Sequence, residues 1–223
     1  MGEKTSASFF AYFQKHRIVF LLAAIVGLIL GKPLLADFFP YRFIPDALLT
    51  IIFVAAIHAI GQKRKHIYVS LGLVVPLFAA VWSYYWLKNA EIVMVGQIFG
   101  ILFTGYAISC LIRFIFSEKE VTKEVIYASV VVYLLLAITW AFAYLILEFF
   151  QRGSFTYPAE QMPDFFHFLY FSCVTITTLG YGDVLPLTQE ASALVILEAI
   201  TGQMYLVVVV AWLVGMHVSH RSR

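Results

Sequence analysis

A run of hydroxyl-bearing and glycine residues near the C-terminal end of the chain has the residue types that could hold a cation. Residues 175–186 read TITTLGYGDVLP, in which Gly180 and Gly182 flank Tyr181 and follow Thr178. Glycine adopts backbone angles that other L-residues resist, so successive carbonyl groups of such a segment can face one side. Carbonyl and hydroxyl oxygens presented in this way could replace the hydration shell of a cation.

The sequence around this run indicates how it is positioned. Residues 164–177 are apolar but too few to cross a bilayer as a helix, which takes about 20 residues. This stretch is therefore interfacial or re-entrant. Non-helical backbone at membrane depth is tolerated only where it is buried in protein or lines a water-filled cavity. The pattern favours a short helix that dips into the membrane, followed by a tight turn that returns to the same face.

The composition of the whole chain is typical of a membrane protein. Of its 223 residues, 62% are hydrophobic and 13% are charged, whereas a soluble domain carries about 25% charged residues. The charges lie in short clusters between long uncharged runs. We therefore predict an all-α membrane protein with six transmembrane helices and one re-entrant pore helix. The six predicted spans are 17–36, 43–61, 67–87, 91–116, 124–149 and 188–216.

The linker 117–123, SEKEVTK, is the predicted boundary between two units. Residues 1–123 would form a four-helix peripheral unit, and residues 124–216 a pore domain with an outer helix, the re-entrant segment and an inner helix. Residues 217–223 would form a short cytoplasmic tail. Lysine and arginine favour the cytoplasmic side, and with the N-terminus inside, 11 of the 15 basic residues lie inside and the other 4 outside. This bias predicts two cytoplasmic termini. We expect an integral membrane protein of the plasma (inner) membrane.

The motif and its surroundings resemble the tetrameric potassium channel family. Residues 178–183, TLGYGD, are similar to the selectivity filter of that family, and residues 164–177 are similar to its pore helix. The family usually has valine or isoleucine at the position of Leu179. The resemblance covers residues 124–216. For residues 1–123 it is limited to the presence of four helices before the pore domain.

This resemblance implies a homotetramer in a lipid bilayer, with one filter strand from each of four subunits around a central pore. Potassium ions would bind to backbone carbonyl oxygens of the filter, and the resemblance implies no other cofactor, no other metal and no nucleic-acid partner. Leu179 and Tyr181 would point outward into protein. The residues expected to form the filter are Thr178, Leu179, Gly180, Tyr181 and Gly182, with the K+ sites at the first four.

The same resemblance assigns residues to the support of the filter and to the gate. Tyr170 stands where many relatives have one tryptophan of a pair, and it can donate a hydrogen bond to Asp183. Thr177 and Asp183 flank the filter and belong to its support. Gly202 is expected to be the hinge of the inner helix, or a glycine that permits close helix packing. The residues expected to line the cavity and inner passage are Gln203, Leu206 and Val210.

Glu198 is an acidic residue inside the last predicted span, where a charged side chain costs about 2.5–3.5 kcal/mol on insertion scales. It precedes Gly202 by about one helical turn, which places it behind the filter rather than in the cavity. We expect it to support the filter through a hydrogen bond to Thr175, Ser172 or Thr177. A role in gating or proton sensing is the alternative.

The functional hypothesis is a channel that conducts K+ passively and is not an enzyme. Its fourth predicted span has a single arginine, Arg113, whereas a voltage sensor needs about 3–4 gating charges in each subunit. Voltage gating should therefore be weak or absent. Two alternatives are a K+ transporter subunit, in which one chain carries four degenerate filter segments, and a non-selective cation channel, which typically loses the tyrosine or the second glycine. Paired carboxylates, metal-spaced histidines and a nucleophile triad, which would indicate a membrane enzyme, are missing from the sequence.

Overall fold

Seven helices make up the part of the chain that the computed structural model describes, residues 16–35, 43–61, 64–87, 89–157 and 164–221. Outside these helices, an isolated antiparallel bridge joins Phe155 to Pro186. The helices are α2 (Arg17–Leu35), α3 (Phe43–Ile60), α4 (Arg64–Leu87), α5 (Ala90–Ser117), α6 (Lys123–Phe150), α7 (Phe165–Ile176) and α8 (Gln189–Arg221).

Side-chain caps fix where two of these helices begin. Asn89 Oδ1 accepts a hydrogen bond from Glu91 N at 2.8 Å at the start of α5. Asp164 Oδ1 accepts one from His167 N at 2.9 Å at the start of α7. Each cap satisfies a backbone N–H group that has no partner inside the helix. The cap at Asp164 thus sets the start of the 12-residue helix α7, whose other end leads into the glycine segment.

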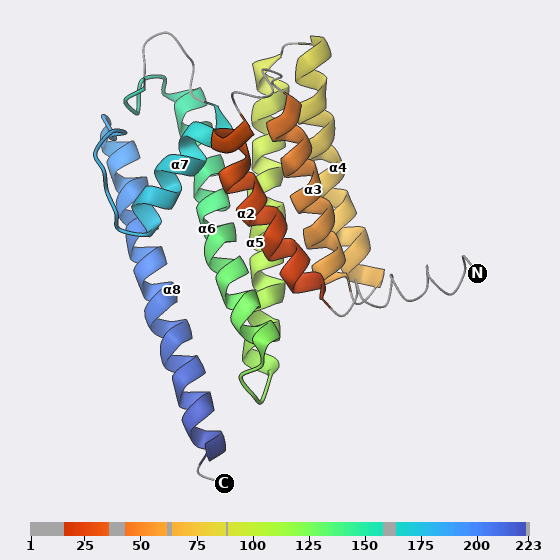
Figure 1. Ribbon diagram of the computed structural model, residues 1–223. Helices are drawn as coiled ribbons and strands as arrows, with labels where there is room; N and C mark the ends of the chain where they lie inside the picture. Colours follow the sequence, from red (N-terminus) through yellow and green to blue (C-terminus); the bar gives the residue numbers. More distant parts are fainter. Residues whose placement is uncertain (1–15, 36–42, 62–63, 88, 158–163, 222–223) are drawn as a thin grey trace, which may run out of the picture.

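Successive long helices alternate in direction (Figure 1). The starts of α2 and α4, the loop between α5 and α6, and the end of α8 lie at one end of the molecule. The short helix α7 lies toward the opposite end and is inclined between α6 and α8. The glycine segment that follows α7 therefore lies well away from the C-terminal end of α8.

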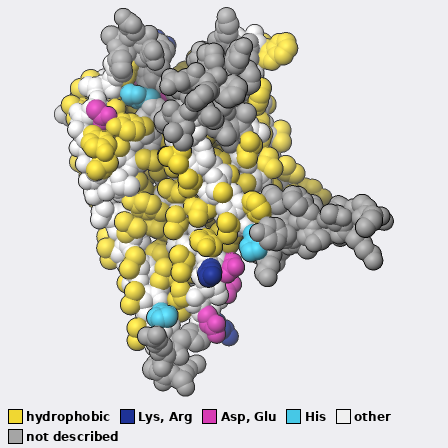
Figure 2. Space-filling view, viewed as in Figure 1, with side chains coloured by type: hydrophobic (Ala, Val, Ile, Leu, Met, Phe, Trp, Pro, Cys, Tyr) yellow, Lys and Arg dark blue, Asp and Glu magenta, His cyan; other side chains and the backbone are white. Residues whose placement is uncertain are grey.

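Four helices of the described residues are long and apolar enough to cross a membrane. The apolar stretches described in α2 and α3 are shorter, Arg17–Gly31 and Leu49–Ala59, so the six spans expected from the sequence stay a prediction. Hydrophobic side chains cover most of the middle of the face shown in Figure 2, and the few charged side chains lie toward its ends. The four candidate spans lie in Arg64–Ser83, Ala90–Ser117, Lys123–Phe150 and Gln189–Val218.

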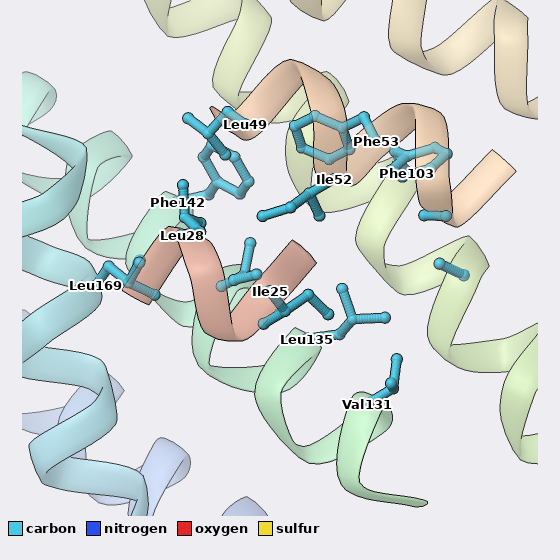
Figure 3. Packing of buried hydrophobic residues seen from close by; sticks show 14 of the residues in the cluster. Ile25, Leu28, Leu49, Ile52, Phe53, Phe103, Val131, Leu135, Phe142 and Leu169 are labelled. Carbon is cyan, nitrogen blue, oxygen red and sulfur yellow. The ribbon is translucent and has the colours of Figure 1, made fainter. Parts of the chain in front are cut away.

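One cluster of buried hydrophobic residues runs through all seven helices. Leu28 of α2 lies near Phe142 of α6 (Figure 3), and both belong to the same cluster as Leu169 of α7. Phe53 of α3 meets Phe103 of α5 edge to face, with ring centroids 5.0 Å apart. The N-terminal helices therefore pack directly on the helices that flank the glycine segment, and the unit boundary near residue 123 stays a prediction.

The described basic residues that were expected inside occupy one end of the molecule. They lie at the starts of α2 and α4, near the end of α5, in the loop and helix start that follow it, and at the end of α8. Arg152 follows α6, toward the other end. The orientation in the membrane stays a prediction, and six of the 15 basic residues lie outside the described residues: Lys4, Lys15, Arg42, Lys63, Lys88 and Arg223.

Candidate functional site

The glycine segment leaves α7 as irregular backbone that stays attached to the last turn of that helix. Leu179 N and Gly180 N both donate to the carbonyl oxygen of Val174, at 3.0 and 3.2 Å. Thr178 N donates to the carbonyl oxygen of Thr175 at 2.9 Å. These bonds use carbonyl groups that lack a partner at a helix C-terminus. The start of the segment is therefore positioned by α7.

Alternate residues of the segment have left-handed backbone. The φ angles of Thr178, Gly180 and Gly182 are 60°, 56° and 77°. Glycine adopts such angles without steric cost, whereas threonine does so against strain. Sequence reasoning anticipated the two glycines and missed Thr178, because a threonine gives no sign that it must take the left-handed region.

The segment from Thr177 to Asp183 is exposed throughout in the described chain. Leu179 is 55% exposed and Tyr181 is 67% exposed, so the described residues give these two large side chains little cover. We expected both side chains to point into protein. In the single chain, that protein is not supplied by the described residues.

Tyr170 of α7 is bonded to the residue that follows the last glycine. Its Oη donates to Asp183 Oδ2 at 2.6 Å, and Val184 N donates to Asp183 Oδ1 at 3.1 Å. The hydrogen bond from Tyr170 lowers the pKa of Asp183, and the same bond raises the pKa of Tyr170 to about 12. At neutral pH the phenol therefore donates to a carboxylate, which is a strong type of hydrogen bond.

The loop after α6 holds the residues that follow the glycine segment. Residues 154–156 pair with residues 185–187 through backbone hydrogen bonds of 2.8 and 2.9 Å. Glu148, buried at the end of α6, accepts hydrogen bonds from Gly153 N and Ser154 N at 2.6 and 3.0 Å. The segment beyond the glycines is thus tied to α6. Sequence reasoning missed this link, because an acidic residue at a helix end gives no sign of which loop amides it binds.

Gly202 of α8 lies against the C-terminal end of α7. A Cβ atom at this position would come within 2.4 Å of Ile176 Cγ1 and 3.0 Å of the Ile176 carbonyl oxygen. That carbonyl also accepts a hydrogen bond from Tyr133 Oη of α6 at 2.7 Å. The glycine therefore permits close packing of α8 on α7. Because α8 is one continuous helix through this position, the hinge role stays a prediction.

The residues expected to line the cavity lie on α8 beyond Gly202. Gln203, Leu206 and Val210 are all exposed on the single subunit. Their spacing of three and four residues places them along one side of the helix. Leu206 is 38% exposed and Val210 is 54% exposed, so the described chain covers these side chains only in part.

Glu198 is fully buried where α6, α7 and α8 meet. Ser172, one of the three partners considered from the sequence, makes a hydrogen bond with Glu198 Oε1. Tyr144 Oη donates to Glu198 Oε2, and sequence reasoning missed this tyrosine. Tyr144 is 54 residues away along the chain, and no local pattern reveals which face of α6 meets α8.

A comparison with known protein families concerns the part of the chain that contains α6, α7, the glycine segment and α8. Residues 125–218 match the family model described as "Ion channel". This part of the chain is therefore similar to the ion channel domains of that family. The match includes α7 and the whole glycine segment, and it extends over most of α6 and α8. No curated protein and no solved structure matches the chain.

Proposed function

We propose that the chain is one subunit of a potassium-selective channel that conducts K+ passively through a fourfold pore. The observation that carries this proposal is the exposed segment TLGYGD, in which alternate residues have left-handed backbone. Exposed irregular backbone is not stable against lipid, because its polar groups need partners. Further copies of the chain and a water-filled pore would provide those partners.

In such a tetramer, four copies of the segment surround the axis. The backbone carbonyl oxygens of residues 178–181 replace the hydration shell of K+, and the hydroxyl of Thr178 adds an oxygen at the inner end. Neighbouring subunits cover Leu179 and Tyr181, whose exposure in one subunit supports this arrangement. Packing around these two side chains then fixes the diameter of the filter.

Below the filter, the proposed cavity is formed by α7 and α8. The C-terminal end of a helix carries roughly half a negative charge, so four copies of α7 aimed at the cavity would stabilise a cation there. Gln203, Leu206 and Val210 would line the cavity and the inner passage. Gly202 would serve as a contact with α7 and as a hinge for opening.

Gating of this channel should depend little on voltage. Arg113 is the one arginine of α5 and lies near its end, where a long side chain can reach the interface and cross little of the field. We propose that both termini face the cytoplasm and that the protein resides in the plasma membrane. A non-selective cation channel or a K+ transporter subunit is the alternative function.

Replacing Gly182 by alanine tests the filter. Gly153 offers a matched control: the two φ angles are 77° and 81°, and in both cases a Cβ atom would meet nothing within 4 Å. The left-handed strain of alanine, about 1–2 kcal/mol, is thus similar at the two positions. In liposomes we expect Gly182→Ala to abolish K+ flux and Gly153→Ala to retain it, with both proteins still tetrameric. Unchanged K+ flux in Gly182→Ala would rule out this filter.

A further inference from the structure

Glu198 occupies an unusual position for an acidic residue. It is 0% exposed, and its two carboxyl oxygens bind groups on two other helices, Tyr144 of α6 and Ser172 of α7. Ser172 Oγ also lies 2.8 Å from the carbonyl oxygen of Ala137 on α6. The side chain of Glu198 on α8 is thereby connected to both α6 and α7.

The number of hydrogens in this cluster decides the state of the carboxyl group. Ser172 has one hydroxyl hydrogen but two acceptors within reach, Glu198 Oε1 and the Ala137 carbonyl oxygen. An ionised carboxylate only accepts, so it would take the serine hydrogen and leave the contact with Ala137 without one. A protonated carboxyl can instead donate to Ser172 Oγ, which frees the serine hydrogen for Ala137. Only the protonated form gives every contact its own hydrogen.

The charges around Glu198 favour the same form. Among the described residues, the titratable groups that interact with it are Tyr144, Tyr133 and Cys173, and none of these three is a cation. A buried ionised carboxylate is costly unless it has an opposite charge beside it. Of the side chains that the structure describes, the other ionisable ones of α6, α7 and α8, tyrosines and cysteines aside, lie near the ends of these helices: Lys123, Glu124, Glu148, His167, Glu190 and His217.

We propose that Glu198 is a neutral carboxylic acid that positions the filter. Its hydrogen-bond chain runs in one direction, from the Tyr144 hydroxyl to Glu198 Oε2, from Glu198 Oε1 to Ser172 Oγ, and from the Ser172 hydroxyl to the Ala137 carbonyl oxygen. This hydrogen-bond chain fixes α8 to α6 and α7 at the level just before Gly202. The end of α7 therefore cannot shift when ions move through the filter. The positioning role rests on the proposed function, whereas the protonation state does not.

Infrared spectroscopy of the assembled wild-type protein tests the protonation state directly. At about pH 7 an ordinary glutamate, with a pKa of about 4.3, is ionised. We expect the wild-type protein to show the carbonyl band of a protonated carboxylic acid, and Glu198→Gln to lack it. Glu190→Gln, which changes an exposed glutamate in the first turn of the same helix, should keep the band. Absence of the band from the wild-type spectrum would overturn the proposal.

The conservative variant Glu198→Gln tests the direction of the hydrogen-bond chain. A glutamine can donate through its amide NH2 to Ser172 and accept from Tyr144, as a protonated glutamate does. Glu198→Gln should therefore keep the thermal stability of the tetramer and the ratio of K+ to Na+ flux. Glu198→Ala should lower the melting midpoint by several degrees and the flux ratio several-fold. If glutamine were as damaging as alanine, the carboxylate would be the ionised acceptor of two hydrogens and the proposal would be wrong.

Two further variants keep the test informative if Glu198→Ala does not assemble. Tyr144→Phe and Ser172→Ala each remove one hydroxyl group of the hydrogen-bond chain, so each should lower the melting midpoint and the flux ratio. Either variant behaving like wild type would contradict the positioning role. If the infrared band is present but the wild-type protein passes K+ and Na+ equally, the protonation state holds and the proposed potassium selectivity fails.

Discussion

Tyr170 and Asp183 show how a single hydrogen bond can fasten the outer end of the proposed filter. The tyrosine comes from α7 and the aspartate follows the last glycine, with 2.6 Å between Oη and Oδ2. The bond lowers the pKa of Asp183 below its ordinary value, which is about 3.9. Its contribution is thus complete above that ordinary value and is lost as the pH falls through the lowered pKa of the folded state.

Removing the phenol hydroxyl should make the outer mouth more sensitive to acid. In Tyr170→Phe the pKa of Asp183 loses its main cause of lowering and returns toward the ordinary value. Potassium flux measured against external pH should therefore begin to fall at a higher pH than in the wild type. Tyr68→Phe, at an exposed position of α4, is the control. Superimposable pH profiles for wild type and Tyr170→Phe would show that the bond does not support the filter.

At the scale of the element, α8 packs on α7 at Gly202, a position where a side chain would have no room. Alanine at Gly202 would place its Cβ 2.4 Å from Ile176 Cγ1. On the same helix, a Cβ atom at Gly215 would meet nothing within 4 Å. The two positions thus separate the effect of packing from the general effect of alanine on a helix.

Gly202→Ala should destabilise the assembled protein by about 1–3 kcal/mol per subunit, the usual cost of overpacking. Gly215→Ala should be neutral or stabilising by up to about 1 kcal/mol, because alanine favours a helix over glycine. Thermal melting of the two purified variants measures the difference. Equal melting midpoints would mean that α8 does not need the close contact with Ile176.

The positions of the helices could be predicted from the sequence because length and hydrophobicity are local properties. The apolar run 164–177 became α7, Phe165–Ile176, and the run 124–149 became α6, Lys123–Phe150. The partners of Glu148 and Glu198 could not be predicted fully, since they depend on which helix faces and loops meet in the folded chain. Tyr170 was the exception, because its place in the motif indicated its bond to Asp183.

At the scale of the whole molecule, the N-terminal helices and the region that matches the ion channel family share one hydrophobic core. The loop between α5 and α6 is short, Glu118 to Thr122, and Thr139 Oγ1 donates to Thr104 Oγ1 at 2.8 Å across these two helices. Leu28 of α2 and Leu169 of α7 both belong to this core (Figure 3). The N-terminal helices therefore support the helix that leads into the proposed filter.

The helix α8 has a large apolar surface that the described chain leaves exposed. Large apolar side chains are exposed along most of its length, including Ile200 at 54% and Val207 at 63%. In the proposed tetramer, lipid and neighbouring subunits cover these side chains, and a water-filled passage runs along the helix face that carries Gln203. The assembly and the conduction of K+ then depend on the same helix.

The reversal potential of the current tests the proposed selectivity most directly. The purified wild-type protein is reconstituted in a planar bilayer with K+ on one side and an equal concentration of Na+ on the other. Because the carbonyl sites of the filter replace the hydration shell of K+, we expect a reversal potential displaced strongly toward the equilibrium potential of K+. A reversal potential near zero would contradict the proposal, since it would mean that the channel passes K+ and Na+ alike.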